Sequence, residues 1–178
     1  TTVIDDAPLV FEPGVLGPDR WEPRNADGQF EGPMPMHTAL AKSKNLVSIR
    51  ILQSIGAGPA HDWLGRFGLD VDRQPATLSL ALGSGSATPL QMASAYAVFA
   101  NGGHRLNPRL IHRITDAQGH ELYQAEPPVL DDDRWRSISP RNAFVMDTLL
   151  RQVTAPGGTA VTVGVPAPED LATISFAG

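Results

Sequence analysis

The sequence predicts an α+β fold, for two reasons. Helical patterns and a single strand pair lie along the 178 residues without the regular strand–helix alternation of a parallel α/β protein. The strand-like runs are also too few for a large central sheet. A chain of this length fits one domain, which can bury roughly 70% of its unfolded surface.

The N-terminal part of the chain is rich in turn-forming residues. They include the dipeptides Pro13-Gly14, Gly17-Pro18, Asp27-Gly28 and Gly32-Pro33. We therefore expect residues 1–35 to form an extended, looping segment with short strands at best. In residues 38–55 the apolar side chains recur at helical spacing. Ser43 and Asn45 disfavour helix interiors, because their side chains compete for backbone hydrogen bonds, so the pattern predicts a break into two helices near Ser43.

The middle of the chain contains two further predicted helices. A short one spans residues 60–67 and ends at Gly68. The alternation of leucines in residues 78–82 is too short to assign. Thr88, as an N-cap followed by proline, begins the best-delimited helix, which continues through Phe99.

The last third contains a predicted hairpin and a predicted helix. Residues 110–115 and 120–124 are strand-like and flank a four-residue turn. Ser139-Pro140 begins a helix that continues to Val153. The rest of the chain, to Gly178, has the pattern of a weakly structured tail.

Composition excludes several classes of function. A net charge of -5 and a pI near 5.4 argue against a nucleic-acid-binding protein, which needs a basic face. The absence of cysteine rules out disulfides, thiolate-bound zinc and a thiol nucleophile. The histidines lack metal-ligand spacing, and the glycine-rich stretches complete no phosphate or dinucleotide loop, so we expect no metal and no cofactor. No stretch is apolar enough for a membrane span or patterned as a signal peptide, so any anchor is expected outside these residues.

The strip Ser43-Lys44-Asn45 is the one candidate for chemistry. Alone, a Ser-x-Asn sequence arises by chance, and a polar turn that interrupts a helix is the better explanation of it. Residues two apart on a helix point to nearly opposite sides, so Ser43 and Asn45 can face one cleft only where the helix bends.

The surrounding segments resemble the transpeptidase domain of class A, bifunctional penicillin-binding proteins. The similar segments are residues 25–33 and 39–50, the run Leu80-Ala81-Leu82-Gly83-Ser84-Gly85-Ser86-Ala87-Thr88-Pro89-Leu90-Gln91-Met92-Ala93, residues 95–103, Gly158-Thr159-Ala160 and Asp170-Leu171-Ala172. They follow in family order and cover most of the chain. Many ordered segments are far more specific than one tripeptide.

The resemblance implies the fold shared with serine β-lactamases and D,D-transpeptidases, here incomplete and mainly the helical lobe with a β-hairpin. In that family a serine attacks the D-Ala-D-Ala amide of a stem peptide and β-lactams trap the same serine. By position, Ser43 would be the catalytic proton-relay hydroxyl, and Asn45 would assist catalysis and bind the substrate amide. Lys44 occupies the variable middle position.

Two of the family's three motifs are absent. Lys42 and Lys44 are the only lysines, and neither follows a serine by three positions, so there is no Ser-x-x-Lys. After Asp170-Leu171-Ala172, where relatives have Gly-Lys-Thr-Gly-Thr, this chain continues with Thr173-Ile174-Ser175. We therefore expect residues 1–178 to be a partial transpeptidase domain, whose missing motifs lie outside this chain or on a second chain.

The resemblance leaves three accounts of function open. The first is a working D,D-transpeptidase that cross-links peptidoglycan and is a target of β-lactams. The alternative is a non-catalytic, degenerate module that binds or organises the cell wall. A β-lactamase or carboxypeptidase of the same fold is the third. The expected partners are stem peptides and β-lactams, and the expected location is the periplasmic face of the cell inner membrane, with an anchor and a glycosyltransferase domain outside this chain.

Overall fold

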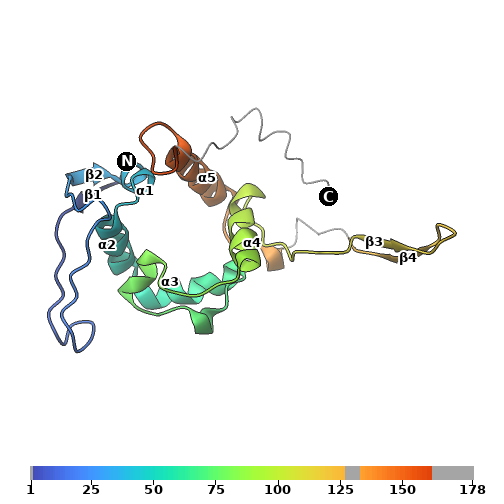
Figure 1. Ribbon diagram of the computed structural model, residues 1–178, viewed down its shortest axis with the longest axis horizontal. Coiled ribbons are helices and arrows are strands. Elements are labelled where there is room, and N and C mark those ends of the chain that lie inside the picture. The colour runs from blue at the N-terminus through green and yellow to red at the C-terminus, as the bar shows by residue number, and fades with distance from the viewer. Residues whose placement is uncertain (1, 127–132, 162–178) are drawn as a thin grey trace. The chain divides into compact units, whose positions relative to one another are not determined.

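The computed structural model describes residues 2–126 and 133–161 (Figure 1). The chain divides into two compact units. The first takes the chain up to Ser54 and resumes at Thr148, and the second is Ile55–Asp147. Asp170-Leu171-Ala172 and the residues after it lie outside the described residues.

The first unit begins with a two-stranded antiparallel sheet. Strands β1 (Val3–Asp6) and β2 (Gly32–Pro35) pair from Val3 with Pro35 to Asp6 with Gly32. The looping connection between them is held by an isolated bridge between Phe11 and Trp21, whose rings stack at 5.3 Å between centroids. The expectation of short strands within a turn-rich segment is confirmed.

Helices α1 (Met36–Ala41) and α2 (Asn45–Ile55) follow this sheet directly. The buried side chains of α2 are Leu46, Val47, Ile49 and Leu52. Val47 packs in a small core with Met34 of β2 and Ala39 of α1. The break between the two helices includes Ser43, as predicted.

The second unit begins with α3 (Ala57–Leu64) and a 3₁₀ turn, Gly65–Phe67. The helix begins three residues earlier than predicted, because Pro59 is tolerated in a first turn, where backbone N–H groups lack partners within the helix. The unassigned leucine-rich stretch is a 3₁₀ helix, Leu78–Leu82. Helix α4 (Pro89–Ala100) begins at a full capping box, in which Thr88 and Gln91 each bind the other's backbone.

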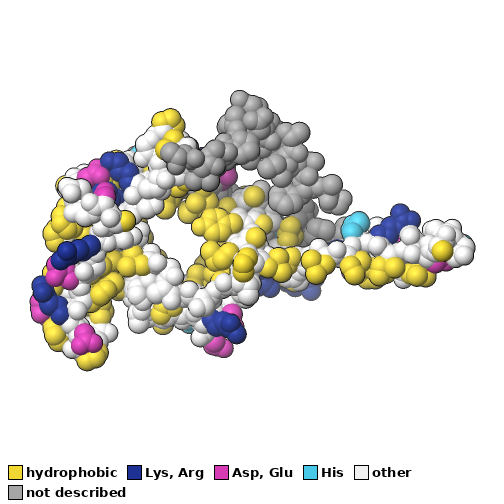
Figure 2. Space-filling view, in the orientation of Figure 1, with side chains coloured by type: hydrophobic (Ala, Val, Ile, Leu, Met, Phe, Trp, Pro, Cys, Tyr) yellow, Lys and Arg dark blue, Asp and Glu magenta, His cyan; other side chains and the backbone are white. Residues whose placement is uncertain are grey.

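The hairpin consists of β3 (Arg113–Thr115) and β4 (Glu121–Gln124), with a register shift after Ile114. The predicted hairpin is confirmed, although its first strand is shorter than expected. Figure 2 shows hydrophobic side chains along one edge of it, in keeping with the exposure of Ile114, Leu122 and Tyr123.

Helix α5 (Pro140–Thr154) begins where Ser139-Pro140 predicted. The Ser139 hydroxyl accepts a hydrogen bond from the Asn142 backbone N–H at 3.2 Å. From Thr148 on, the helix belongs to the first unit, together with the described residues that follow it, up to Val161.

Candidate functional site

The turn between α1 and α2 ends α1 with a non-glycine residue, Ser43, in the left-handed conformation. The Lys44 N–H donates to the Ala39 carbonyl at 2.9 Å, and the Ser43 N–H donates to the Leu40 carbonyl at 3.0 Å. These two bonds define a Schellman motif, in which glycine usually takes the left-handed position. Here Ser43 takes it, with a φ of 53°, the only positive φ of a non-glycine residue among those described.

The turn directs the three residues of the motif differently. Ser43 is exposed, Lys44 is buried and Asn45 is half-buried. A continuous helix would rotate these side chains by a constant step around its axis. The break instead leaves the two flanking side chains accessible and sends the middle one inward.

The Ser43 side chain meets Thr159, a residue from the far end of the sequence. Their hydroxyl oxygens lie 3.1 Å apart, and either can be the donor. The Thr159 backbone N–H also donates to the Ala41 carbonyl at 3.0 Å, which fixes the threonine beside α1. Ser43 and Thr159 are 116 positions apart, so spacing could not predict the contact. The only signal was the family-like segment Gly158-Thr159-Ala160.

The turn that presents Thr159 needs a glycine before it. The Gly158 N–H donates to the Ala155 carbonyl at 2.9 Å, and the Ala160 N–H donates to the Val153 carbonyl at 3.0 Å. A Cβ atom on Gly158 would collide with the Val153 carbonyl oxygen. The chain therefore reverses tightly after α5 and carries Thr159 to the Ser43 turn.

Asn45 is the first residue of α2, and its side chain is held at its amide nitrogen. Nδ2 donates to the Arg24 carbonyl at 2.9 Å. This bond uses one of the two amide hydrogens, and the side chain makes no second hydrogen bond to the part of the chain that the structure describes. In this described part of the chain, Ser43 and Asn45 are not hydrogen-bonded to each other. The carbonyl oxygen of the Asn45 amide remains an acceptor for an N–H of a ligand.

Lys44 lies among three carboxylates. Its side chain is 1% exposed, and its Nζ lies 2.8 Å from Asp27 Oδ2, 3.0 Å from Glu31 Oε1 and 3.4 Å from Asp6 Oδ2. Asp6 is fully buried, whereas Asp27 and Glu31 reach the surface. The sequence alone gave no role to this middle residue of the motif.

A hydrogen-bond network extends this cluster into the backbone. Asn25 Nδ2 donates to Asp6 Oδ1 at 2.7 Å, and the Glu31 N–H donates to Asp6 Oδ2 at 3.1 Å. The Leu46 N–H, in the first turn of α2, donates to Asn25 Oδ1 at 3.2 Å. The fully buried Asp6 carboxylate is thus satisfied on both oxygens, as buried charges require.

Electrostatics favour the charged forms of Lys44, Asp27 and Glu31. Burial disfavours the charged ammonium of Lys44, but hydrogen bonds to Asp27 and Glu31 and the charge of Asp6 outweigh it, so the pKa of Lys44 is raised. Its hydrogen bond to Asp27 lowers the pKa of that carboxyl group. Hydrogen bonds from Lys42 and then from Lys44 lower the pKa of Glu31. A permanently protonated Lys44 is unsuited to accept a proton from a nucleophile.

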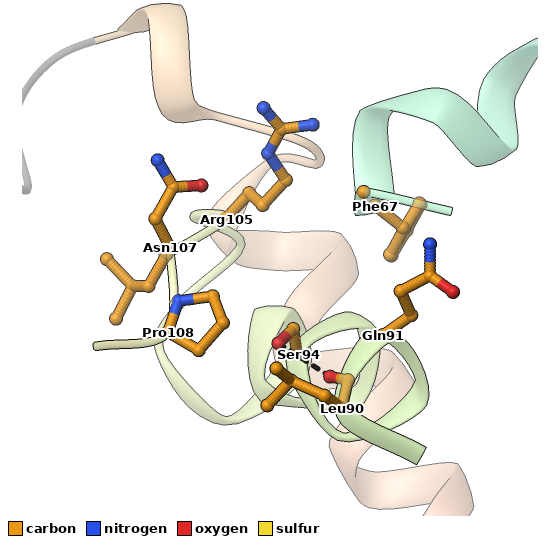
Figure 3. A pocket seen from close by; sticks show the side chains of 9 residues that line it. Phe67, Leu90, Gln91, Ser94, Arg105, Asn107 and Pro108 are labelled. Atoms are coloured by element: carbon orange, nitrogen blue, oxygen red, sulfur yellow. Dashed lines mark hydrogen bonds between the residues drawn. The ribbon is translucent and has the colours of Figure 1, made fainter. Parts of the chain in front are cut away.

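The second unit has a pocket of about 270 Å³, shown in Figure 3. Two of its polar groups are engaged within the protein: Ser94 Oγ donates to the Leu90 carbonyl at 2.8 Å, and Arg105 donates to the Gly65 carbonyl at 3.1 Å. The lining residues include no nucleophile paired with a base. Among the described residues there is also no group of side chains that could hold a metal ion, and no helix long and apolar enough to cross a membrane.

The fold and the motif define a class of protein. The family profile described as penicillin-binding protein transpeptidase domain matches residues 2–167. The chain belongs to this family, and its helices and small sheets form part of the α+β D,D-transpeptidase fold.

The particular relatives are penicillin-binding proteins 1A. The protein of that name from Neisseria gonorrhoeae is 44% identical over 159 residues, which cover 88% of this chain and 20% of the relative. That of Pseudomonas aeruginosa is 45% identical over 128 residues, 71% of this chain and 15% of the relative. The chain thus spans about a fifth or less of the length of these curated relatives.

Solved structures agree on the fold. Penicillin-binding protein 1A from Haemophilus influenzae matches with a TM-score of 0.81 and 30% identity, over 93% of this chain and 30% of that one. The D,D-transpeptidase domain of a peptidoglycan glycosyltransferase from Eggerthella lenta matches with a TM-score of 0.70 over 93% of this chain and 46% of that one. The latter is 19% identical, and its likeness concerns the fold alone.

Proposed function

We propose that this chain supplies Ser43 and Asn45 to a D,D-transpeptidase that cross-links peptidoglycan stem peptides through a serine acyl-enzyme. The observation that carries the proposal is the Ser43 turn. A serine in the left-handed position of a helix C-terminus, exposed and bonded to a second hydroxyl, is costly for stability and suited to proton transfer. Family membership supplies the class of reaction.

The proposed reaction has two halves. The oxygen of a nucleophilic serine outside this chain attacks the carbonyl carbon between the two D-Ala residues, and the C–N bond breaks. The proton of that serine passes through a lysine, also outside this chain, and the Ser43 hydroxyl to the departing nitrogen, so D-Ala leaves as a neutral amine. An amine of a second stem peptide then attacks the ester, transfers its proton back by the same route and releases the serine.

Asn45 would hold the peptide during both halves. A neutral carboxamide can bind a peptide amide without adding charge to the site. The bond from Nδ2 to the Arg24 carbonyl restricts rotation of this side chain, which reduces the entropy lost on binding. The proposed working location is the periplasmic face of the inner membrane, where stem peptides are found, with the anchor outside this chain.

Acylation by a fluorescent penicillin tests the proposal on the full-length protein. The wild type is expected to become labelled. S43A is expected to label about a hundredfold more slowly, because it lacks the relay hydroxyl. N45A should be slower by about tenfold, the effect of losing one or two hydrogen bonds. S54A is the matched control, because the Ser54 hydroxyl bonds to the Ile51 carbonyl within α2.

Each account of function predicts a different result. A full-length protein that takes up no label would favour the non-catalytic module that binds or organises the cell wall. Labelling followed by rapid release of hydrolysed penicillin would favour a β-lactamase, and release of D-Ala without cross-linked product would favour a carboxypeptidase. An S43A variant that labels as fast as S54A would contradict the role of Ser43.

A further inference from the structure

Lys44 carries a charge that the proposed chemistry does not use. Its ammonium is buried and surrounded by Asp6, Asp27 and Glu31, all within 3.4 Å. Burying an ammonium is unfavourable unless opposite charges and hydrogen bonds compensate for it. Here they do, and the arrangement requires the backbone at Lys44 to be held in one place.

The three carboxylates come from different segments of the first unit. Asp6 ends β1, Glu31 precedes β2, and Asp27 lies in a turn closed by the Gly28 N–H and the Asn25 carbonyl at 3.0 Å. One ammonium therefore ties the sheet and its connecting loop to the turn between α1 and α2. Figure 2 shows acidic and basic side chains adjacent over this part of the chain.

The backbone of Lys44 is held as firmly as its side chain. Its N–H closes the Schellman motif on Ala39, and its carbonyl accepts bonds from the Ser48 N–H and hydroxyl, both at 3.2 Å. The peptide unit that links Ser43 to Lys44 is consequently fixed on its C-terminal side. A strained conformation persists when its surroundings over-determine it, and these contacts do so for Ser43.

We propose that Lys44 is a positioning residue for transpeptidation: its buried ammonium, held by Asp6, Asp27 and Glu31, keeps Ser43 in the left-handed turn that aims the Ser43 hydroxyl. This inference rests on the proposed function of Ser43. Lys44 itself touches neither substrate nor nucleophile. Its effect on the reaction passes through Ser43.

Lys42 provides a matched control two residues away. It is also a lysine bound to Glu31, with Nζ 2.6 Å from Oε2, but its side chain is 40% exposed. An exposed ion pair of this kind contributes little. Replacing either lysine by methionine removes one ammonium and keeps an unbranched side chain. K44M removes a buried ammonium with three carboxylate partners, and K42M removes an exposed one bound to Glu31.

The experiment measures the second-order rate constant for acylation of the full-length protein by a fluorescent penicillin. K44M is expected to acylate at least about tenfold more slowly, since small displacements of a reacting group cost up to a hundredfold. K42M should stay within about twofold of the wild type. In an S43A background, K44M should add less than about a twofold effect, because the residue through which it acts has been removed.

D27N covers the case in which K44M fails to fold. Asp27 is 51% exposed, and Asp6 and Glu31 remain beside the ammonium when it is changed. D27N is expected to slow acylation about threefold in the wild-type background and not in S43A. Circular dichroism identifies folded variants.

The outcomes separate the two proposals. If K44M slows acylation by the same factor in the wild-type and S43A backgrounds, the positioning role is overturned, because a merely structural effect does not depend on Ser43. If K44M does not fold, the same comparison is made with D27N. K44M rates equal to those of K42M would overturn it as well. A wild type that takes up no label, or an S43A variant that acylates normally, would instead refute the proposed function.

Discussion

Ser43 adopts a left-handed backbone conformation at a position where helices commonly end with glycine. A Cβ atom in this conformation costs roughly 1–2 kcal/mol. Stability alone would therefore favour a residue without a side chain here. The presence of serine is instead explained by the chemistry of its hydroxyl group, which lies 3.1 Å from that of Thr159.

The strain at Ser43 can be measured separately from its chemistry. S43G and S43A both lack the hydroxyl, but only glycine relieves the backbone. We expect the thermal midpoint of S43G to exceed that of S43A by about 2–4 °C, the shift that corresponds to about 1 kcal/mol in a domain of this size. Scanning calorimetry of the full-length protein provides the comparison. A lower midpoint for S43G would mean that the turn imposes no strain.

At the scale of elements, the loop after α4 depends on a close approach of two backbones. The Gly103 carbonyl accepts hydrogen bonds from the Ser137 N–H at 2.8 Å and the Ile138 N–H at 3.2 Å. Gly103 has a φ of +100°, and a Cβ atom there would collide with the Ile138 carbonyl oxygen. Gly102 also has a positive φ, of +74°, but a Cβ atom would meet only open space.

These neighbouring glycines form a matched pair for mutation. G102A is expected to lower the free energy of unfolding by about 1 kcal/mol, the cost of a left-handed alanine. G103A should lower it by about 2–3 kcal/mol, because the collision adds to that cost. Urea denaturation of the full-length protein, followed by circular dichroism, distinguishes them. Equal losses would show that the loop can move away from Ile138 freely.

At the scale of the whole molecule, contacts between distant parts of the chain assemble the first unit. Thr159 lies 116 positions after Ser43, and Asn25 bonds to Asp6 across 19 positions. Three carboxylates of this unit, those of Asp6, Asp27 and Glu31, gather around Lys44. Lys44 pairs with the buried carboxylate of Asp6 and with two exposed ones, Asp27 and Glu31, whose pKa values are lowered.

The stability of the protein should fall in acid because of this cluster. The pKa values of Asp27 and Glu31 lie below their ordinary values of 3.8 and 4.5. Their contribution is therefore complete above those values and disappears as the pH falls through the lowered ones. We expect a thermal midpoint that is constant above about pH 5 and declines below it.

E31Q identifies the source of that decline. Glutamine cannot be protonated in this range, so the midpoint of E31Q should depend less on pH than that of the wild type between about pH 5 and 3. E12Q is the control, because Glu12 pairs with Arg20 in a contact where both side chains are more than half exposed. If the thermal midpoint of E31Q changes with pH as steeply as that of the wild type, Glu31 is excluded as the titrating group.

Local sequence patterns predicted most of the elements. Thr88-Pro89 marks the start of α4, Ser139-Pro140 that of α5, and Ser43 with Asn45 the break between α1 and α2. These signals act within one helical turn, because caps and helix breakers work through hydrogen bonds to nearby backbone groups. Leu78–Leu82 could not be assigned because a segment this short does not show the periodic spacing of apolar residues that distinguishes a helix from a strand.

The sequence by itself determined the α+β class, the starts of α4 and α5, the break between α1 and α2, and the family, and with them Ser43 and Asn45 as candidate residues. Only the tertiary structure decided that Lys44 lies buried among three carboxylates and that Thr159 meets the Ser43 hydroxyl. Both contacts join segments whose separation in sequence has no regular period. The spacing of residues therefore cannot predict them, and they exist because packing brings those segments to the same turn.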